Sequence, residues 1–430
     1  MNKDTKILAT LVTIASLVLA IGFTVDFYNT LTYPGPDLRN RVVGARLMLE
    51  GIDPYFFKWQ PGWSKRFYDP MDSPTELVAK LSVPPTVLAV HAVMADLSYV
   101  QQKVIWLLAQ WGALIGTLLI FLKTSNSQAK KVLMLSASFF FANSLFWRLH
   151  ISSGQIYVIY IFLLAITWLF ANHRSSYSHL VSGFFAGVTV GLRPSFILLF
   201  IPFISRKKHL FVSGGALGLL SSLTASWLVA GTFIWHRYFL MILKMTGLIE
   251  LDTYLSAAER TLPSPGILYP QIVESFNWNI QYPLERYFAD TALYTYLNML
   301  RIPNERGMLL IGLVATMTFL SLHIFRHSSQ KDGTINSLFL FGVLMGLVVE
   351  FFIPIARYPY YDIQMLLPLL IIINEADTEY LISRKRNILL IVGLLLSTVG
   401  FVVVPKALFF GAFLIALYVV TMAISVVKQT

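Results

Sequence analysis

The sequence contains repeated apolar stretches that are long enough to cross a lipid bilayer. A helix needs about 20 apolar residues to cross about 30 Å of hydrocarbon, and in that medium only helices and closed barrels satisfy their backbone polar groups. The stretches lie at residues 7–25, 104–122, 132–149, 155–171, 180–204, 210–230, 307–325, 335–354, 363–374, 388–404 and 406–427. They predict an all-α polytopic membrane protein.

Prolines modify two of the apolar stretches. Arg193-Pro194 interrupts the stretch 180–204. Because proline removes a helix hydrogen bond, we expect two short segments that meet near one membrane face. Segment 84–98 is apolar but begins with two prolines and contains a His and an Asp, and we expect it to lie in the interface or to re-enter. The total is then about twelve transmembrane helices.

The charges orient this arrangement. A formal charge of +11 would suggest nucleic-acid binding in a soluble protein. The connections on one side of the twelve-helix arrangement, however, hold fifteen basic and five acidic residues, which is +10 of that total. Because basic residues gather in cytoplasmic loops, both termini are predicted to be cytoplasmic. The two long polar stretches, 26–83 and 231–306, are then predicted to face outward.

Composition excludes other classes. Hydrophobic residues make up 56% of the chain and charged residues 13%, and there is no cysteine. Disorder, a coiled coil, disulfides and zinc–thiolate sites are therefore excluded. Because the chain has no P-loop, GxGxxG, HExxH or GxSxG motif, no nucleotide cofactor or zinc site is expected. The aromatic residues are too dispersed for a nucleic-acid surface.

Several polar residues fall at the predicted outer face or just within it, where they are costly and indicate function. They are Asp37, Asp53, Arg148, His150, Gln155, Arg193, Arg357, Tyr358 and Asp362.

The segment after Asp37 has the pattern of an amphipathic interfacial helix. Its apolar positions are Leu38, Val42, Ala45 and Leu49, and its polar positions are Arg39, Arg41 and Arg46. Asp37 suits either the N-cap of this helix or a functional carboxylate. Asp53 precedes a proline and suits a helix stop and turn.

The other candidates also allow two interpretations. Arg193, at the helix break, suits either phosphate binding or an extension to lipid headgroups. Gln155 follows Gly154 at the end of a span and suits either a sugar hydroxyl or a bond across helices. His150 is more typical of an interfacial histidine than of a base.

A tight outer loop contains the last group of candidates. Arg357 and Asp362 suit an ion pair, and Tyr358 also suits an interfacial aromatic belt. Glu350 lies inside a span close to this loop and has to be neutral or paired.

In order and spacing, these motifs resemble glycosyltransferase family 87, membrane glycosyltransferases of the GT-C fold that use polyprenyl-phosphate sugars. The resemblance covers roughly residues 5–210. Its motifs are Asp37, Gly44-Ala45-Arg46, Gly51-Ile52-Asp53-Pro54-Tyr55, Val83-Pro84-Pro85, Gly154-Gln155, Gly187 to Pro194 and Arg206-Lys207-Lys208. Val83 stands in place of the usual Tyr and Arg193 in place of the common Lys. The family's later histidine-containing loop has no clear counterpart unless Arg357-Tyr358 occupies it.

The resemblance implies a GT-C-like catalytic transmembrane module at residues 1–230 that includes outer loop 26–83. A large outer loop at 231–306 and C-terminal transmembrane helices at 307–430 follow. Asp37 is implied as general base on the acceptor and Arg193 as the group that neutralises the donor phosphate. The implied substrate-binding residues are Gln155, Asp53, Tyr55, His150, Arg357 and Tyr358.

The implied reaction is inverting transfer of a hexose from a polyprenyl phosphate to a lipid or glycan acceptor of the cell envelope. Mannose is the sugar that the family suggests. The site would lie at the outer face of the cytoplasmic membrane, among membrane lipids, with no metal or cofactor. The alternatives are a transporter or lipid flippase, which typically has matched halves with broken helices, and a membrane scaffold.

Overall fold

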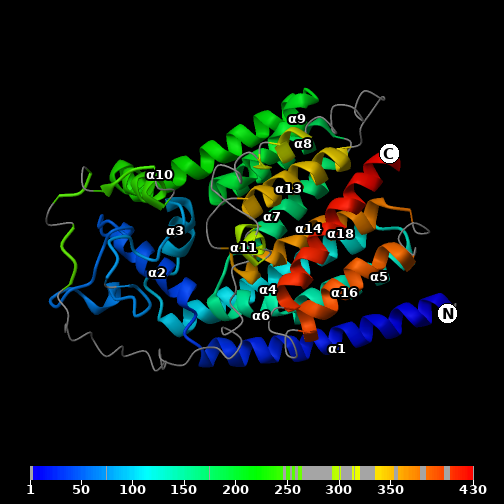
Figure 1. Cartoon of the computed structure of the whole chain (residues 1–430), viewed down its shortest axis with the longest axis horizontal. Coiled ribbons are helices and arrows are strands. Elements are labelled where there is room, and N and C mark those ends of the chain that lie inside the picture. Colours follow the sequence, from blue (N-terminus) through cyan, green and yellow to red (C-terminus); the bar gives the residue numbers. More distant parts are fainter. Residues whose placement is uncertain are drawn as a thin grey trace.

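The computed structural model describes residues 3–73, 75–173, 175–245, 335–352, 357–377, 384–400 and 407–429, with short pieces between 248 and 319. All regular elements among these residues are helices (Figure 1). The first half holds α1 (Lys3–Thr32), α2 (Pro36–Leu49), η1 (Lys65–Phe67), α3 (Pro85–Ala92), α4 (Tyr99–Thr124), α5 (Gln128–Asn143), α6 (Leu145–Ser153), α7 (Tyr157–Ala171), α8 (Ser176–Leu192), η2 (Pro194–Leu199), α9 (Phe200–Ser205) and α10 (His209–Met245). The second half holds α11 (Leu293–Met299), α13 (Ile335–Phe352), η5 (Pro359–Met365), α14 (Leu366–Glu375), α16 (Arg384–Leu395), η6 (Leu396–Gly400) and α18 (Ala407–Gln429).

Three of the described helices, α4, α10 and α13, are long and apolar enough to cross a membrane. A fourth span results if α5 and α6, which are bent by 54°, are taken together. Shorter apolar helices lie at 157–171, 194–205, 387–398 and 410–424. Most of the predicted span 307–325 lies outside the described residues, so the count of twelve stays a prediction. The start of α1 and the end of α18 lie at the same end of the molecule (Figure 1), as an even number of spans requires.

The two prolines of segment 84–98 begin a short helix. α3 has 8 residues and at 1.5 Å per residue is about 12 Å long, which is too short to cross the bilayer. The chain turns after α3 and enters α4 at Tyr99. The prediction that this segment does not span is therefore supported. The predicted break at Arg193 is confirmed as well, because α8 ends at Leu192 and η2 starts at Pro194.

The prediction of an interfacial amphipathic helix after Asp37 is wrong for α2. Ten of the eleven residues from 38 to 48 are buried, and Arg39, Arg41 and Arg46 are only 1, 5 and 7% exposed. The three arginines donate hydrogen bonds to backbone carbonyls of other segments, among them Tyr68 O, Gly154 O and Ala95 O. The sequence pattern cannot distinguish an arginine that binds buried carbonyls from one that binds lipid headgroups, because a guanidinium suits both.

α8 and α10 pack with their backbones in direct contact. A Cβ atom added to Gly183 or Gly187 of α8 would collide with the backbone of α10 at Phe211 or Gly215. Small residues four positions apart permit such close packing between membrane helices. The contact fixes the end of α8, where Arg193 follows.

The predicted outer loop 231–306 begins with helix. α10 continues to Met245 past a bend at Gly231, whose φ is 69°. The predicted end of the span at residue 230 therefore coincides with the bend, whereas the helix itself continues 15 residues beyond residue 230. Residues 264–292 of this loop lie outside the described residues.

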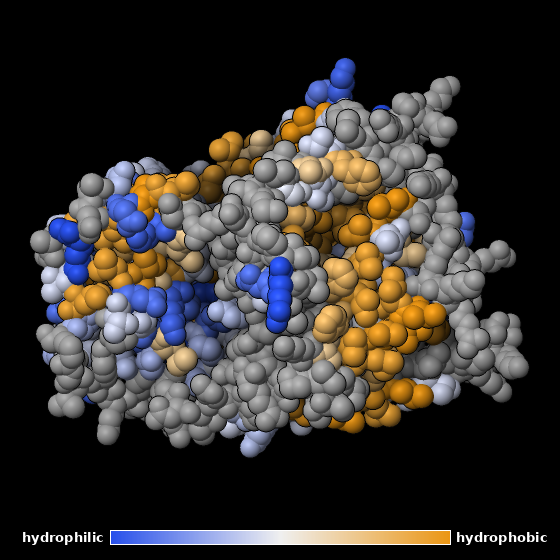
Figure 2. Space-filling model, in the orientation of Figure 1, coloured by the Kyte–Doolittle hydropathy of each residue, from blue (hydrophilic) through white to orange (hydrophobic). Residues whose placement is uncertain are grey.

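The molecule exposes a broad apolar surface. Figure 2 shows hydrophobic side chains gathered over the side of the molecule formed by α16 and α18. Exposed large hydrophobic residues there include Ile388, Ile391, Phe410 and Phe413. Such a continuous apolar surface suits contact with lipid and is unusual on a soluble monomer.

Candidate functional site

Asp37 lies in the first turn of α2 and is held by a residue of a distant segment. Gly35, with φ 71°, occupies the N-cap position, and Asp37 makes no capping bond, so the N-cap interpretation of Asp37 is wrong. Its carboxylate oxygen Oδ2 accepts a hydrogen bond from Gln155 Nε2. Gln155 Oε1 in turn accepts one from Arg41 Nη2. We call Asp37, Gln155 and Arg41 the Asp37 cluster.

The backbone carbonyls of Gly154 and Gln155 are also held by hydrogen bonds. α6 ends at Gly154, which has a left-handed φ of 74° that glycine adopts without strain. Gly154 O accepts hydrogen bonds from Trp106 Nε1 at 3.0 Å and from Arg41 Nη1 at 2.9 Å. Gln155 O accepts one from Gln110 Nε2 at 2.6 Å. Gln155 is therefore positioned before any ligand binds.

The surroundings of Asp37 suit a general base. Burial raises the pKa of this carboxyl, while the charge of Arg41, the hydrogen bond from Gln155 and the charge of Lys80 lower it. A general base is most effective when its pKa is near the working pH. The residue as a whole is partly accessible.

Arg193 forms a second cluster with a carboxylate from α13. Its Nε and Nη2 atoms donate to Glu350 Oε1 at 2.9 and 2.7 Å. Gln364 Nε2 donates to Glu350 Oε2 at 3.0 Å, and Ser195 Oγ lies 3.2 Å from Oε1. The requirement that Glu350 be paired is therefore met by Arg193. The Arg193 side chain is still 25% exposed.

Tyrosine rings connect the two clusters. The Arg193 guanidinium carbon lies 5.2 Å from the ring centroids of both Tyr157 and Tyr361. Tyr157 follows Gln155 by two residues, and its ring centroid is 5.9 Å from that of Tyr360. Burial raises the pKa of the Tyr360 phenol, and the negative charge of nearby Asp37 raises it further. Asp37 and Arg193 are thus linked through a short series of contacts.

The tight loop before α14 contributes a second arginine. Arg357 and Asp362 form the predicted ion pair at 2.6 Å, and each side chain is only 2% exposed. The Arg357 guanidinium carbon lies 4.0 Å from the Phe351 ring centroid and 5.6 Å from that of Tyr361. The Tyr361 ring is therefore close to both arginines. Tyr358 is 38% exposed, at the rim of this group.

His150 is a buried structural residue. It is 0% exposed, its Nε2 accepts a hydrogen bond from the backbone of Val158 at 3.3 Å, and its ring stacks on Trp147. The predicted substrate contact of His150 is not supported by this geometry, since packing occupies its ring.

Asp53 and Tyr55 stabilise the turn that follows α2, at the opposite end of this helix from Asp37. Asp53 Oδ1 accepts from the Tyr55 amide at 2.9 Å, and Oδ2 pairs with Arg237 Nε at 3.0 Å. Tyr55 is fully buried, and its hydroxyl donates to Val83 O at 3.0 Å. The turn interpretation of Asp53 is supported, and the predicted substrate contacts of both residues are not.

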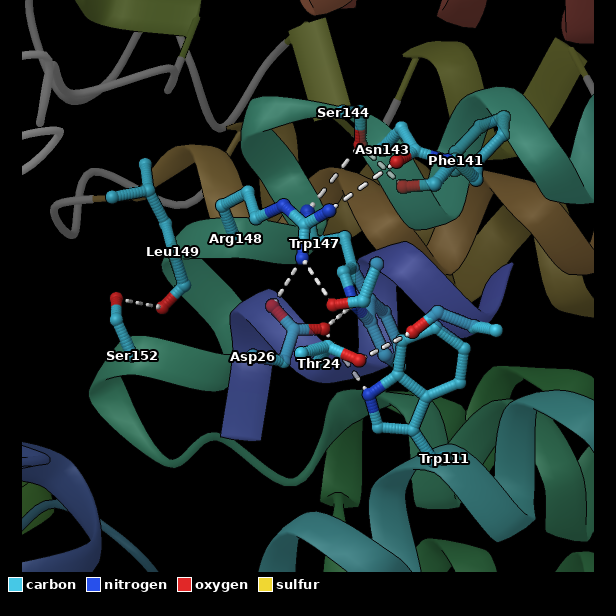
Figure 3. Close-up of polar contacts among 12 residues, drawn as sticks. Thr24, Asp26, Trp111, Phe141, Asn143, Ser144, Trp147, Arg148, Leu149 and Ser152 are labelled. Atoms are coloured by element: carbon cyan, nitrogen blue, oxygen red, sulfur yellow. Dashed lines mark hydrogen bonds and ion pairs between the residues drawn. The ribbon is translucent and has the colours of Figure 1, made fainter. Parts of the chain in front are cut away.

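Asp26 is a buried acid that the sequence patterns did not single out. Figure 3 shows that it accepts hydrogen bonds from Arg148 Nη1, Trp147 Nε1 and Trp111 Nε1, the last two at 2.7 and 3.1 Å. Arg148 also donates to Asn143 Oδ1 at 3.2 Å. The group joins α1 to α6, the helix that leads to Gln155. The available signal was an acid directly after the first apolar stretch.

Within the described part of the chain, no group of three His, Asp or Glu residues could hold a metal ion. Metal independence stays a prediction.

One comparison with known proteins identifies a family. The family model of glycosyltransferase family 87 matches residues 83–350, which is more than half of the 430 residues. The matched region includes Gln155, Arg193 and Glu350, and it begins after Asp37. No curated protein and no solved structure is significantly similar to the chain.

Proposed function

Because the chain belongs to glycosyltransferase family 87 and is a membrane glycosyltransferase, we propose that it transfers a hexose from a polyprenyl phosphate to a hydroxyl of an acceptor. Mannose is the proposed sugar, and the outer face of the cytoplasmic membrane is the proposed location. The observation that carries the proposal is the linkage of Asp37 to Arg193 through Gln155 and Tyr157. It brings a carboxylate and a cation into one series of contacts.

The proposed reaction is a single displacement at the anomeric carbon. Asp37 accepts the proton of the acceptor hydroxyl as its oxygen forms a bond to this carbon. The bond from the same carbon to the phosphate oxygen breaks, and its electron pair leaves with the polyprenyl phosphate. Asp37 then loses the proton to solvent. The products are the glycosylated acceptor and the free polyprenyl phosphate.

The contacts of Glu350 support inversion at the anomeric carbon. A retaining enzyme that works through a covalent intermediate needs a second carboxylate as nucleophile. Glu350 is the acid next to Arg193, and both of its oxygens are already bound, by Arg193 and Ser195 on one side and Gln364 on the other. Asp37 alone would then act on the acceptor.

Two arginines support the assignment of a phosphate leaving group. The guanidinium carbons of Arg193 and Arg357 lie 5.2 and 5.6 Å from the Tyr361 ring centroid. Fixed positive charges of this kind stabilise charge that develops on a leaving oxygen, and a guanidinium binds phosphate through parallel hydrogen bonds. The carboxylates of Glu350 and Asp362 hold the two arginines in place while no donor is bound.

An apolar cavity beside these arginines supports a lipid donor. The cavity has a volume of about 230 Å³ and lies between α13, η5 and α18. The described residues that line it are all apolar and include Phe351, Met365 and Phe413. The Arg357 guanidinium lies 4.0 Å from the ring centroid of Phe351. A polyprenyl chain in the cavity would therefore place its phosphate near the arginines.

Reconstitution of the purified protein in vesicles with radiolabelled polyprenyl-phosphate mannose tests the proposal. Incorporation of label into an octyl mannoside acceptor is the expected result. Movement of the labelled donor across the vesicle without bond formation would support the transporter alternative, which the family match does not favour. The absence of both transfer and movement would overturn the proposed donor.

A further inference from the structure

A second cavity, apart from the Asp37 cluster, lies in the segment between α2 and α3. Its volume is about 180 Å³. The residues that line it are Lys58, Trp59, Tyr68, Asp69, Pro70, Asp72 and Pro263. All seven are partly accessible among the residues that the structure describes.

Two aromatic rings form one wall of this cavity. The ring centroids of Trp59 and Tyr68 are 5.4 Å apart, with an angle of 60° between the ring planes. The Trp59 indole nitrogen donates to Ser64 O at 3.2 Å, and Tyr68 O accepts from Arg39 at 3.1 Å. These two hydrogen bonds hold Trp59 and Tyr68 in place. Aromatic faces at a water-accessible site pack well against the C–H faces of sugar rings.

Two carboxylates also line the cavity. Asp72 binds Lys58 Nζ at 2.8 Å and the Lys80 amide at 3.1 Å, one with each oxygen, which makes it part of the frame. Asp69 Oδ1 accepts from the Met71 amide at 2.9 Å, while its other oxygen accepts no hydrogen bond from the described residues. Burial raises the pKa of Asp69 to about 7. A carboxyl group so placed can exchange hydrogen bonds with a hydroxyl of a ligand.

The cavity continues toward Asp37. A narrower cavity of about 40 Å³ shares Trp59, Asp69 and Asp72 with it and reaches Asn40 and Gly44 of α2. Asn40 lies about one helical turn after Asp37, on the same side of α2.

Lys80 is close to both carboxyl groups. Burial raises the pKa values of Asp37 and Asp69, and the charge of Lys80 lowers both. Lys80, which lines the narrower cavity, is therefore within electrostatic reach of both carboxyl groups.

We propose that this cavity is an acceptor subsite that binds one sugar ring of a glycan whose neighbouring ring receives the hexose. The inference rests on the proposed function and narrows the acceptor to a glycan of at least two rings. The volume is below the roughly 300–1,000 Å³ of sites for drug-sized ligands, which suits a single ring. Lys58, Asp69 and Asp72 make the lining unsuitable for a lipid chain, because charged groups lose hydration against hydrocarbon.

A tryptophan exchange with an internal control tests the subsite. Trp59→Ala removes a wall of the cavity, and Trp63→Ala removes a 44% exposed tryptophan of the same segment that is not among the lining residues. Transfer is measured to octyl mannoside and to the matching octyl mannobioside. For Trp59→Ala we expect the KM of the two-ring acceptor to rise about tenfold, equivalent to about 1.4 kcal/mol. Asp69→Asn should act in the same direction.

Several readouts should not change. The KM of the one-ring acceptor, the KM of the donor and kcat should keep their wild-type values in the Trp59→Ala protein. Trp63→Ala should change none of them. Equal effects on the two acceptors, or no effect on the two-ring acceptor, would overturn the subsite.

Direct binding separates this inference from the proposed function. Saturation-transfer NMR of octyl mannobioside with the purified protein in detergent needs no donor and no turnover. We expect binding by the wild-type and Trp63→Ala proteins and loss of binding in the Trp59→Ala protein. If this binding pattern is found without any sugar transfer, the cavity is still a glycan-binding site and the proposed transferase reaction is rejected. Wild-type transfer without this binding pattern would reject the subsite alone.

Discussion

Gln155 donates a hydrogen bond to Asp37 across 118 residues of sequence. Because Arg41 binds the carboxamide oxygen of Gln155, the amide can present only its nitrogen to the carboxylate. Gln155 is therefore a positioning residue for Asp37 in this structure. The interpretation that it pairs across helices accounts for its contacts better than a direct bond to a sugar hydroxyl.

Asp37→Asn should abolish sugar transfer without unfolding the protein. The amide keeps the size of the side chain but cannot accept a proton, and loss of a general base typically costs about 10²–10⁴ in rate. Transfer of label from the polyprenyl donor and thermal unfolding in detergent are the measurements. Asp96→Asn, at a carboxylate that is 90% exposed, is the control. A well-folded Asp37→Asn enzyme with full activity would reject Asp37 as the base.

Arg41→Gln should shift the acid limb of the pH–rate profile to higher pH. Asp37 acts as a base only when ionised, so activity falls as the pH drops through its pKa. Burial raises this pKa and the charge of Arg41 lowers it; without that charge the pKa rises further. The profile of kcat/KM against pH measures the shift, and Arg41→Lys, which keeps the charge, should leave the limb close to that of the wild type. The same shift in both variants would contradict the electrostatic explanation.

Arg193→Ala should weaken the use of the donor far more than the use of the acceptor. Loss of a charge-assisted phosphate contact is worth about 1.5–3 kcal/mol, so the donor KM should rise by about tenfold or more. Arg193→Lys should restore part of the effect, because it keeps the cation and loses the planar geometry. Arg66→Ala, at a side chain that is 40% exposed, serves as control. Equal small changes in the two KM values would leave Arg193 as a headgroup contact.

Gly154→Ala should lower activity, whereas Gly51→Ala should not. Both glycines have a left-handed φ, 74° and 69°, so both substitutions introduce backbone strain of about 1–2 kcal/mol. A Cβ at Gly154 would also collide with Leu38, next to Asp37, whereas a Cβ at Gly51 meets nothing within 4 Å. Thermal unfolding should show a similar loss of stability from backbone strain in both variants. Gly154→Ala should lose further stability through the collision with Leu38. Equal activities of the two variants would contradict a close fit of Gly154 against α2.

Asp26→Ala should destabilise the protein strongly. It leaves the Arg148 guanidinium without its carboxylate and removes the acceptor of two tryptophan N–H groups. Removal of one partner of a buried ion pair typically costs about 3–5 kcal/mol. Unfolding in detergent should show a smaller loss for Asp26→Asn, which keeps an oxygen for the indoles. A stability close to the wild type for Asp26→Ala would show that Arg148 finds another partner.

Local sequence patterns predicted the features that depend on neighbouring residues. The break at Arg193 follows from the proline beside it, and the short α3 follows from the prolines that begin it. Arg357 and Asp362 are five residues apart in one loop, so their pairing was visible as well. In each case the physical cause lies within a few residues of the feature.

Patterns did not predict the contacts that join distant segments. Arg41 occupies a polar position of an apparently amphipathic helix, and only the folded chain brings it to Gln155. The partner of Arg193 was not visible either, although the need for Glu350 to be neutralised was. Tyr55 belongs to a recognisable motif, but its burial depends on helices that the motif does not specify.

The pairing of Arg193 with Glu350 has a consequence for synthesis of the protein. Arg193 leaves the ribosome 157 residues before Glu350, and a cation at membrane depth is costly while it lacks a partner. During this interval Arg193 has to remain at the water boundary, where its long side chain can reach hydration. A nascent chain that stops before α13 therefore lacks both the carboxylate that neutralises Arg193 and a finished donor site. Insertion of α13 supplies the carboxylate, whereas the proposed donor site also needs Arg357 and Tyr361, which follow α13 in the chain.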